Sequence, residues 1–433
     1  MGVIHQDMLV ENQVNRVAII GYNRIPFARQ NTNYAEAGNT QMMTAALSGL
    51  IKRYHLEGKL LGEVAGGAVI KHSWEVNLMR ECVLKTSLDP KTPACDIQQA
   101  CDTSIEAAVY IANKIALGQI EVGIAGGVDS TSNVPLVLGE KLRTILLSIR
   151  RSKTFGERVK HILKIRPKDL VPVGPMNKEL QTGLSMGEHT EHTAKYYNIP
   201  RDEQDKFALE SHLKMVKAYD EGFYDDLLSP YLGLEKDNNL RADSSLEKLS
   251  KLKPAFNKEN GSLTAGNSSA LTDGASCILL ASEKWAKMSN YPILAYITFA
   301  ELAAIEYTQN KHNLLLAPIY ASSRMVAKAG LKLQDFDFYE IHEAFSAQVL
   351  ATLKIWESDE LSLQFGLAKG LGAIDRTKLN VKGSSLAAGH PFAATGTRVV
   401  ATMAKLLNER GSGKGFISVC AAGGHGITVI LEK

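Results

Sequence analysis

Three residues of this 433-residue chain lie in short segments rich in glycine or small residues, where a reactive side chain could meet a ligand. Cys101 is part of IQQACDTSIEAA, His390 of AAGHPFAATG and Cys420 of SVCAAGGHG. A cysteine thiolate is a nucleophile, a histidine can take up the thiol proton, and a second cysteine can exchange a proton with a carbon atom. Together these side chains predict covalent catalysis at a cysteine.

Each of these residues also has a purely structural interpretation, because isolated cysteines are usually small buried hydrophobes. Cys101 is distinguished by its predicted place at the start of a buried helix. Unpaired N–H groups there lower the pKa of a thiol. Asp102 would raise that pKa unless its side chain turns away to cap the helix. His342, in YEIHEAFSAQVLA, lies at another strand-to-helix corner, and such corners converge in α/β sheets.

The elements that must position these residues follow an α/β order. Residues 103–117 are apolar nearly all round, which predicts a buried helix, and 121–127 predicts a central strand that ends on glycines. A similar order recurs near the C-terminus, with a helix over 394–407 and a strand over 415–424. We interpret this as an internal duplication, although two unrelated βαβ units would look alike at this level.

The duplication predicts three parts of the chain. Residues 1–135 form an N-terminal half, completed by about 267–290, and residues 291–433 form a C-terminal half. Between them, 136–266 is too polar and irregular to be a further copy, and we expect it to be a folded inserted loop domain.

A basic stretch at 141–168 stands out within this insertion. Its apolar residues have helical spacing, and Glu157 is its only acid, so we expect two short amphipathic helices joined near Lys153. One interpretation is a solvated hairpin packed on its own domain. The others are docking to an anionic membrane surface, to a partner subunit, or to the phosphates of a ligand.

Composition excludes several other classes of protein. A net charge of +3 gives no reason to expect nucleic-acid binding. Five scattered cysteines without a C-x-x-C pair argue against a disulfide framework and a metal site. The chain has no apolar stretch of about 18 residues, and its opening MGVIHQDMLVENQ carries acids, so we expect a cytoplasmic protein, peripheral at most to a membrane.

Six segments together resemble the thiolase superfamily, and the resemblance covers nearly the entire chain. They are QQACDTS, AGGVDS, TAGNSSALTDGAS, HEAFSAQ, SLAAGHPFAATG and CAAGGHG. The resemblance implies an α/β fold in which two duplicated βαβαβ halves form a layered α/β/α/β/α core. It also implies that Cys101 is the acylated nucleophile, His390 its activating base, and Cys420 the proton donor and acceptor at the substrate α-carbon. The backbone N–H groups of Cys101 and Ala422 would form an oxyanion hole.

Other site residues follow from the same resemblance. Ser269 would touch the pantetheine arm of coenzyme A, and Met186 would line its channel. Many thiolases have asparagine where this chain has His342. This variant, with LKPAF at 252–256, resembles the thiolase subunit of trifunctional β-oxidation complexes.

The function implied is that of a 3-ketoacyl-CoA thiolase, an acetyl-CoA C-acyltransferase that cleaves 3-ketoacyl-CoA with coenzyme A into acyl-CoA and acetyl-CoA by a ping-pong mechanism. Coenzyme A is a substrate, and no cofactor is held covalently. A homodimer is the smallest assembly expected, and a hydratase/dehydrogenase α subunit is a further candidate partner. Alternatives are an acetoacetyl-CoA thiolase that condenses two acetyl-CoA molecules and a catalytically silent lipid-binding subunit. Cys420 disfavours a β-ketoacyl synthase, which lacks this terminal cysteine.

Overall fold

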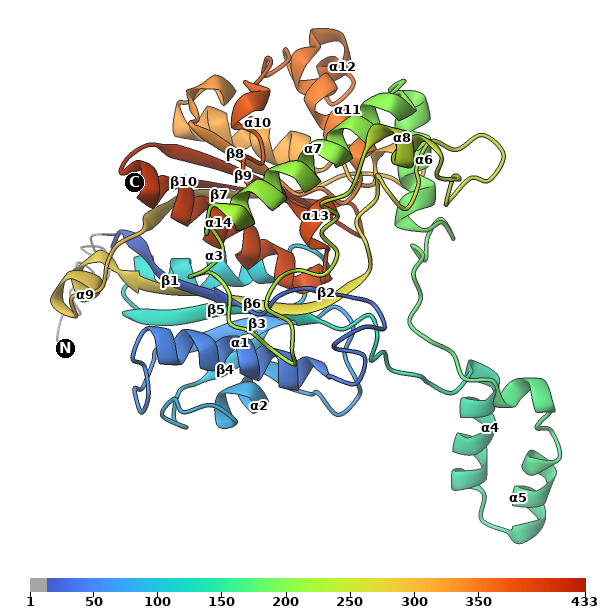
Figure 1. Ribbon diagram of the computed structural model, residues 1–433. Helices are drawn as coiled ribbons and strands as arrows, with labels where there is room; N and C mark the ends of the chain where they lie inside the picture. Colours follow the sequence, from blue (N-terminus) through green and yellow to red (C-terminus); the bar gives the residue numbers. More distant parts are fainter. Residues whose placement is uncertain (1–13) are drawn as a thin grey trace, which may run out of the picture.

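The computed structural model describes residues 14–433, and its sheet is built from two similar halves (Figure 1). The first half contains β1 (Val17–Arg24), β3 (Glu63–Gly67), β4 (Ala94–Asp96), β5 (Val122–Asp129) and β6 (Thr272–Ser282), with the short β2 (Ala28–Arg29) beside β6. The second half contains β7 (Ala295–Ala304), β8 (Phe338–Ile341), β9 (Lys414–Ala421) and β10 (His425–Glu432). The stretch 1–13, which contributed to the cytoplasmic prediction, lies outside the described residues.

The strand order shows that one structural unit occurs twice. It runs β4-β3-β5-β6-β1 in the first half and β8-β9-β10-β7 in the second. Strand β3 runs parallel to β5, and β8 runs parallel to β9. All neighbouring strands that lie between β5 and β9 in the strand order pair antiparallel. The halves join where Val17–Ile19 of β1 pairs with Ala295–Ile297 of β7. The predicted duplication is confirmed, although among residues 14–433 the second half has no counterpart of β4.

The helices complete a layered α/β/α/β/α core (Figure 1). Two helices, α3 (Thr103–Ala116) and α14 (Thr395–Arg410), lie between the half-sheets and share one apolar cluster with β6 and β9. Helices α1 (Asn39–Arg53) and α2 (Leu78–Leu84) cover the outer face of the first half, while α10 (Pro318–Ala329) and α11 (Ser346–Glu357) cover that of the second. The remaining helices outside the insertion are α9 (Glu283–Met288), α12 (Asp359–Leu363), α13 (Ser385–Ala388), η3 (Lys311–Asn313), η4 (Leu333–Asp335), η5 (Arg376–Lys378) and η6 (Phe392–Ala394).

The two central helices touch at their N-terminal ends because small residues lie there. A Cβ atom on Gly396 would come within 2.4 Å of the backbone nitrogen of Ile105. Beside this contact, the backbone N–H of Thr397 donates to Ser104 Oγ at 2.9 Å. The close approach brings the loop before α3 to the loop before α14, and these loops carry Cys101 and His390.

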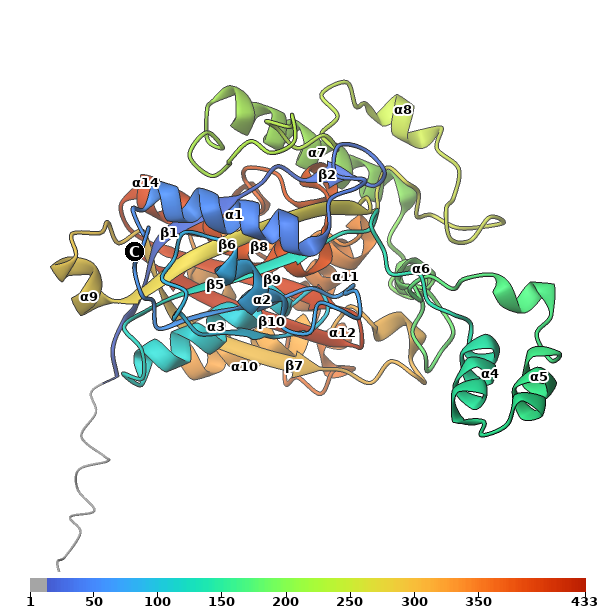
Figure 2. The same cartoon turned by 90° about the horizontal axis from the view of Figure 1, so that it is seen from below.

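The insertion divides into two parts that lie differently on the core. Helices α6 (Met186–Tyr196), α7 (Arg201–Asp220) and α8 (Leu246–Ser250) lie against the rest of the protein. Helices α4 (Glu140–Arg151) and α5 (Phe155–Ile162), followed by η2 (Pro167–Leu170), form a hairpin that stands away from the main body (Figures 1 and 2). Two helices joined near Lys153 are therefore confirmed. The interpretation in which the hairpin packs on the rest of the inserted domain is wrong, because the hairpin stands away from α7 and α8 in both views (Figures 1 and 2).

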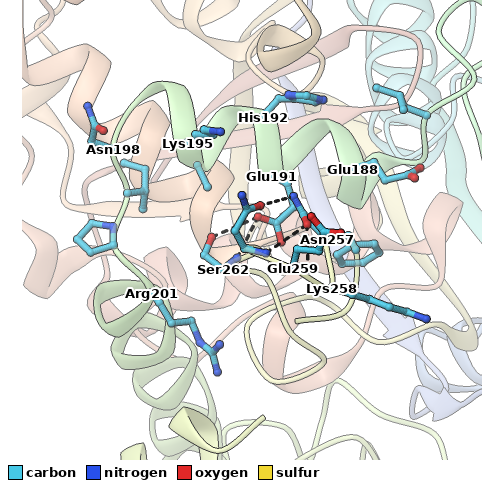
Figure 3. Close-up of a pocket in the computed structure, with 16 residues that line it drawn as sticks. Glu188, Glu191, His192, Lys195, Asn198, Arg201, Asn257, Lys258, Glu259 and Ser262 are labelled. Carbon is cyan, nitrogen blue, oxygen red and sulfur yellow. Dashed lines mark hydrogen bonds between the residues drawn. The ribbon is translucent and has the colours of Figure 1, made fainter. Parts of the chain in front are cut away.

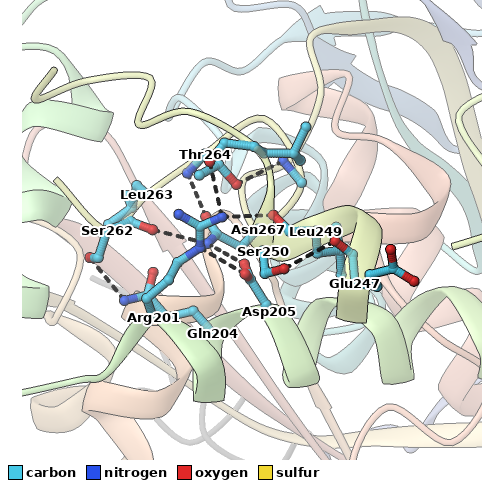
Figure 4. A network of polar contacts seen from close by, with 12 residues as sticks. Arg201, Gln204, Asp205, Glu247, Leu249, Ser250, Ser262, Leu263, Thr264 and Asn267 are labelled. Atoms are coloured by element: carbon cyan, nitrogen blue, oxygen red, sulfur yellow. Dashed lines mark hydrogen bonds and ion pairs between the residues drawn. The ribbon is translucent and has the colours of Figure 1, made fainter. Parts of the chain in front are cut away.

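Part of the insertion is fixed by a buried polar network at the start of α7 (Figure 4). Arg201 Nε donates to Asp205 at 2.7 Å, and its Nη2 donates to the Leu249 carbonyl at 2.7 Å. Asn267 Nδ2 donates to Asp205 at 2.9 Å, while its own Oδ1 accepts from the N–H of Thr264 at 2.7 Å. The network thus ties the TAGNSS segment to α7. The predicted division of the chain into three parts, near residues 135, 266 and 290, stays a prediction.

Within residues 14–433, none of the helices combines the length and the apolar character that a bilayer crossing requires.

The contact between the central helices predicts that Gly396→Ala will lower the free energy of unfolding by about 1–3 kcal/mol, because the backbone of α3 cannot yield to the added methyl group. Gly156→Ala, in the exposed helix α5 with nothing within 4 Å of the new Cβ, is the control and should cost nothing. Urea unfolding followed by circular dichroism measures both. Equal stabilities for the two variants would contradict the close packing of α3 on α14.

Candidate active site

Cys101 lies on a tight turn between β4 and α3. The preceding Ala100 has a φ of 48°, a left-handed conformation that costs a residue with a side chain about 1–3 kcal/mol. Thr103 holds the turn, since its Oγ1 donates to the Ala100 carbonyl at 2.7 Å and accepts from the N–H of Gln99 at 2.9 Å. The thiol is therefore presented at the N-terminal end of a buried helix, as the sequence predicts.

His390 comes from the corresponding corner of the second half. Gly389 before it has a φ of 97°, which only glycine adopts readily, and Pro391 follows it. His390 Nε2 lies 3.1 Å from Cys101 Sγ, and His390 Nδ1 lies 2.6 Å from Thr395 Oγ1. Because Nδ1–H can donate to the threonine, Nε2 is left as the acceptor for the thiol proton. This geometry is that of a nucleophile and its base.

The pKa of the thiol differs from the sequence-based expectation. Burial, followed by the nearby Asp102 carboxyl, raises the pKa of Cys101 to about 12, although the N–H groups of Ala422 and Cys101 act to lower it. Burial, followed by the charge of Arg398, lowers the pKa of His390 to about 3. The expected thiolate is thus wrong for the resting enzyme, because loss of solvation outweighs the helix N-terminus. At neutral pH the pair is a thiol and a neutral imidazole.

Asp102 does not cap the helix, so of the two alternatives for this residue the one in which its carboxyl raises the pKa of the thiol holds. Its side chain is fully buried and accepts no cap hydrogen bond from α3. Both carboxyl oxygens lack a hydrogen-bond partner among residues 14–433. Burial, then the charge of Glu106, raises the pKa of Asp102 well above its ordinary value.

Cys420 lies at the end of β9 and is 2% exposed. Burial, followed by the proximity of Cys101 and Asp102, raises the pKa of its thiol well above the ordinary value. Cys420 is therefore a weaker acid at rest than an ordinary cysteine. Cys420 also belongs to an apolar cluster that contains Phe345 and packs against Met186.

His342 is fully buried at the end of β8 and lies beside His390, with ring centroids 4.2 Å apart. Its Nδ1 lies 2.8 Å from Ser385 Oγ, whereas its Nε2 has no hydrogen-bond partner among the described residues. Burial, followed by the charges of His390 and Arg398, lowers the pKa of His342 well below its ordinary value. The ring is a neutral group with one nitrogen left for a ligand.

The two residues predicted to contact coenzyme A lie on either side of this region. The N–H of Ser269 donates to the carbonyl of Ala344 at 2.9 Å, which places this half-buried serine beside the HEAF segment. Met186 is the first residue of α6 and packs against the apolar cluster that includes Cys420. The structure therefore gathers Cys101, His390, Cys420 and His342 at one place, with Ser269 and Met186 near its edge.

A hollow of about 1000 Å³ lies outside this constellation (Figure 3). It opens between α6, the start of α7 and the 256–262 loop, and its rim carries Glu188, Lys195 and Lys258. Phe256 lines the hollow and also packs on Phe345, with ring centroids 5.8 Å apart. We assign the chemistry to the cysteine site rather than to this hollow, because the hollow lacks a nucleophile paired with a base.

Sequence reasoning did not single out the residues that support the two histidines. Thr395, Ser385 and Arg398 contact the histidines directly or through one another. Asp129 accepts N–H bonds from Val69, Ile70 and Ala393, and so holds loops of both halves together. The sequence places these supporting residues close to the reactive residues along the chain. That position alone does not reveal which group each of them bonds.

A duplicated α/β/α/β/α core whose two halves supply a thiol and its base is the arrangement of an acyl-transferring enzyme with a cysteine nucleophile. Residues 17–284 match the model of the thiolase N-terminal domain, and residues 292–433 match that of the thiolase C-terminal domain. The chain belongs to the thiolase family.

Individual relatives agree with this assignment. The chain is 40% identical over 431 residues to a 3-ketoacyl-CoA thiolase of Pectobacterium carotovorum, covering 98% of each chain. Among solved structures, the acetyl-CoA acetyltransferase of Bacillus anthracis is similar with a TM-score of 0.82 and 30% identity, over 98% of this chain and 100% of that one. Human mitochondrial 3-ketoacyl-CoA thiolase has a TM-score of 0.80 and 26% identity, with the same coverage.

The raised pKa of Cys101 predicts how its alkylation depends on pH. Because only the thiolate reacts, the rate of modification by iodoacetamide should rise about tenfold per pH unit between pH 6 and 9 without a plateau. Mass spectrometry of the Cys101 peptide measures this rate. A plateau near pH 7 would show that the resting enzyme holds a stable thiolate.

Proposed function

We propose that this chain is a 3-ketoacyl-CoA thiolase, which cleaves 3-ketoacyl-CoA with coenzyme A into acyl-CoA and acetyl-CoA. The observation that carries the proposal is the 3.1 Å contact between Cys101 Sγ and His390 Nε2, at a site that also contains Cys420. Coenzyme A enters as a substrate, and no covalently held cofactor takes part. Ser269 and Met186 are assigned to its pantetheine arm.

In the first half-reaction, Cys101 Sγ attacks the keto carbon while its proton passes to His390 Nε2. The alkoxide formed accepts hydrogen bonds from the backbone N–H groups of Cys101 and Ala422, each worth about 3 kcal/mol. Collapse of the adduct breaks the bond between the α- and β-carbons and expels the enolate of acetyl-CoA. Cys420 donates its proton to the enolate carbon, leaving the acyl group on Cys101.

The enolate needs its own stabilisation, and the two histidines are assigned to it. After it takes the thiol proton, His390 can donate from Nε2, and the neighbouring His342 has a ring nitrogen available for the same thioester oxygen. In the second half-reaction, the thiol of coenzyme A gives its proton to the Cys420 thiolate and attacks the acyl carbon. The bond to Cys101 Sγ then breaks, and His390 returns its proton to Cys101.

A second candidate is an acetoacetyl-CoA thiolase that condenses two acetyl-CoA molecules. The structural likeness to an acetyl-CoA acetyltransferase favours it. Both candidates use the same cysteine chemistry, and they differ in the acyl chain that the site accepts. A catalytically silent subunit is disfavoured, because the nucleophile and its base are in contact.

A homodimer fits the exposed edge of the first half. Strand β4 ends the strand order and pairs only with β3. The loop before α2 is tied to β4 by an ion pair between Lys71 and Asp96 at 2.6 Å. This loop exposes Trp74 (72%) and Val76 (83%), and an open strand edge beside exposed apolar groups suits a second copy of the chain.

We further propose that the α4/α5 hairpin docks on an anionic membrane surface. Residues 140–170 contain ten lysines and arginines against three acids, and the apolar Phe155 and Leu163 are 80% and 78% exposed. Basic groups near an anionic surface contribute about 1 kcal/mol each, and the apolar groups can enter the interface. A hydratase/dehydrogenase subunit is the alternative partner for this hairpin.

The proposed function predicts that the wild-type protein thiolyses acetoacetyl-CoA and a long-chain 3-ketoacyl-CoA, the latter faster. Cys101→Ser should lower kcat at least about 10³-fold, whereas Cys420→Ala should still be acylated but lose exchange of α-protons in deuterated water. Cys95→Ala, a half-buried cysteine in β4, is the control. Thiolase activity retained by Cys101→Ser would remove the assignment, and a preference for acetoacetyl-CoA would favour the second candidate.

The hairpin can be tested by excision, because Val137 and Val173 exchange backbone hydrogen bonds of 2.9 and 2.8 Å at its base. Replacing 139–171 by a short glycine-serine turn should abolish sedimentation with phosphatidylglycerol vesicles and leave acetoacetyl-CoA thiolysis intact. Binding by the intact protein should weaken with added salt. If the intact protein does not bind these vesicles at low salt, the membrane proposal fails, and the partner subunit becomes the candidate.

A further inference from the structure

A chain of buried polar groups leads from α14 to His342. Arg398 is 2% exposed, and its Nη2 donates to Ser385 Oγ at 2.6 Å, while its Nη1 donates to Ser384 Oγ at 3.0 Å. Ser385 Oγ in turn lies 2.8 Å from His342 Nδ1. The two serines therefore share one guanidinium, but only Ser385 reaches the histidine.

The hydrogen atoms in this chain can be assigned from donor and acceptor chemistry. A guanidinium has only donors, so Ser385 Oγ must accept from Arg398. Among the described residues, Arg398 and His342 are the only side chains that Ser385 Oγ contacts within hydrogen-bonding distance. Its own hydrogen is therefore directed to His342 Nδ1, which must be the unprotonated nitrogen. In a neutral ring, the remaining proton then lies on Nε2.

We infer that Ser385 and Arg398 are positioning residues that fix His342 in the tautomer with hydrogen on Nε2, so that His342 donates a hydrogen bond to the substrate thioester oxygen. The inference rests on the proposed function for the identity of that oxygen. It is supported by the full burial of His342 and by the absence of a partner for Nε2 within residues 14–433.

The neighbouring histidine is held in the opposite tautomer. His390 Nδ1 faces Thr395 Oγ1 at 2.6 Å, which leaves Nε2 to accept the proton of Cys101 at 3.1 Å. The two neighbouring imidazoles, tilted by 47° to each other, thus have different tasks, one as a base and one as a donor. The role of base requires His390 Nδ1–H to donate to Thr395 Oγ1, whereas the guanidinium of Arg398 makes the Ser385 hydroxyl the donor to His342.

The surrounding contacts fix Ser385 in the position that this task requires. Glu343 accepts from the N–H of Leu386 at 3.0 Å and from Ser211 Oγ at 2.7 Å. Ser211 Oγ accepts from the N–H of Ser384 at 3.1 Å. These bonds anchor α13, and the carboxyl group of Glu340 lies 3.8 Å from the guanidinium of Arg398.

The test compares Ser385→Ala with Ser384→Ala in the full-length protein. The first variant removes the hydroxyl that contacts His342, and the second removes a hydroxyl that contacts the same guanidinium but does not reach His342. Nitrogen NMR of protein labelled with ¹⁵N-histidine reports the tautomer of His342, with the resonance assigned by its loss in His342→Gln. Steady-state thiolysis of acetoacetyl-CoA gives kcat and KM for coenzyme A.

We expect His342 to carry hydrogen on Nε2 in the wild type and in Ser384→Ala, with kcat of this control within about twofold of wild type. In Ser385→Ala the tautomers should mix, and kcat should fall about tenfold or more with an unchanged KM for coenzyme A, because an oxyanion donor is lost in part of the molecules. Ser385→Thr retains the hydroxyl and should restore both readouts.

Hydrogen on Nδ1 of His342 in the wild type would overturn the inference, and this measurement does not depend on either serine variant. An unchanged tautomer and kcat in Ser385→Ala would overturn it as well, as would equal losses of kcat in both serine variants without a change of tautomer. If the wild type has the expected tautomer but does not thiolyse 3-ketoacyl-CoA, the proposed function fails while the tautomer assignment stands.

Discussion

The contact between Cys101 Sγ and His390 Nε2 joins two residues that are 289 positions apart in the chain, and the surrounding core maintains it. Each residue lies on a turn before a central helix, and the two helices touch where Gly396 leaves no room for a side chain against Ile105. A thiol and an imidazole must be within about 3.2 Å to exchange a proton. Packing at the interface between the halves therefore sets the distance on which the proposed reaction depends.

Burial determines the charge state of this site. In a water-excluded environment, ionised thiol and imidazole groups lose solvation, so Cys101 and His390 are neutral at rest. Charge then develops only during the reaction, when an oxyanion forms on the substrate. Fixed donors around such a site stabilise an oxyanion more strongly than water would, because they need not reorganise. The hydroxyl groups of Thr395 and Ser385 contact the Nδ1 atoms of His390 and His342, and so orient the two imidazoles before the oxyanion forms.

The insertion has a different physical character from the core. Helix α7 is tied down by the buried network around Asp205 and Asn267, which also fixes the segment that leads to Ser269. The α4/α5 hairpin instead exposes apolar and basic residues away from the body (Figure 2). The part of the insertion that contains α7 thus lies against the core near the site. The α4/α5 hairpin presents a second, separate surface.

The sequence by itself determined the duplicated α/β architecture, because the period of apolar residues and the glycines at strand ends are local properties. It also indicated Cys101, His390, Cys420 and His342, since each lies at a strand-to-helix or strand-to-loop corner. Only the tertiary structure decided the pKa of the Cys101 thiol, the burial of the Asp102 side chain and the contacts of Ser385 and Arg398 that support His342. Solvation and hydrogen-bond partners come from residues far away in the chain, so neither follows from the local pattern that places a residue on a turn.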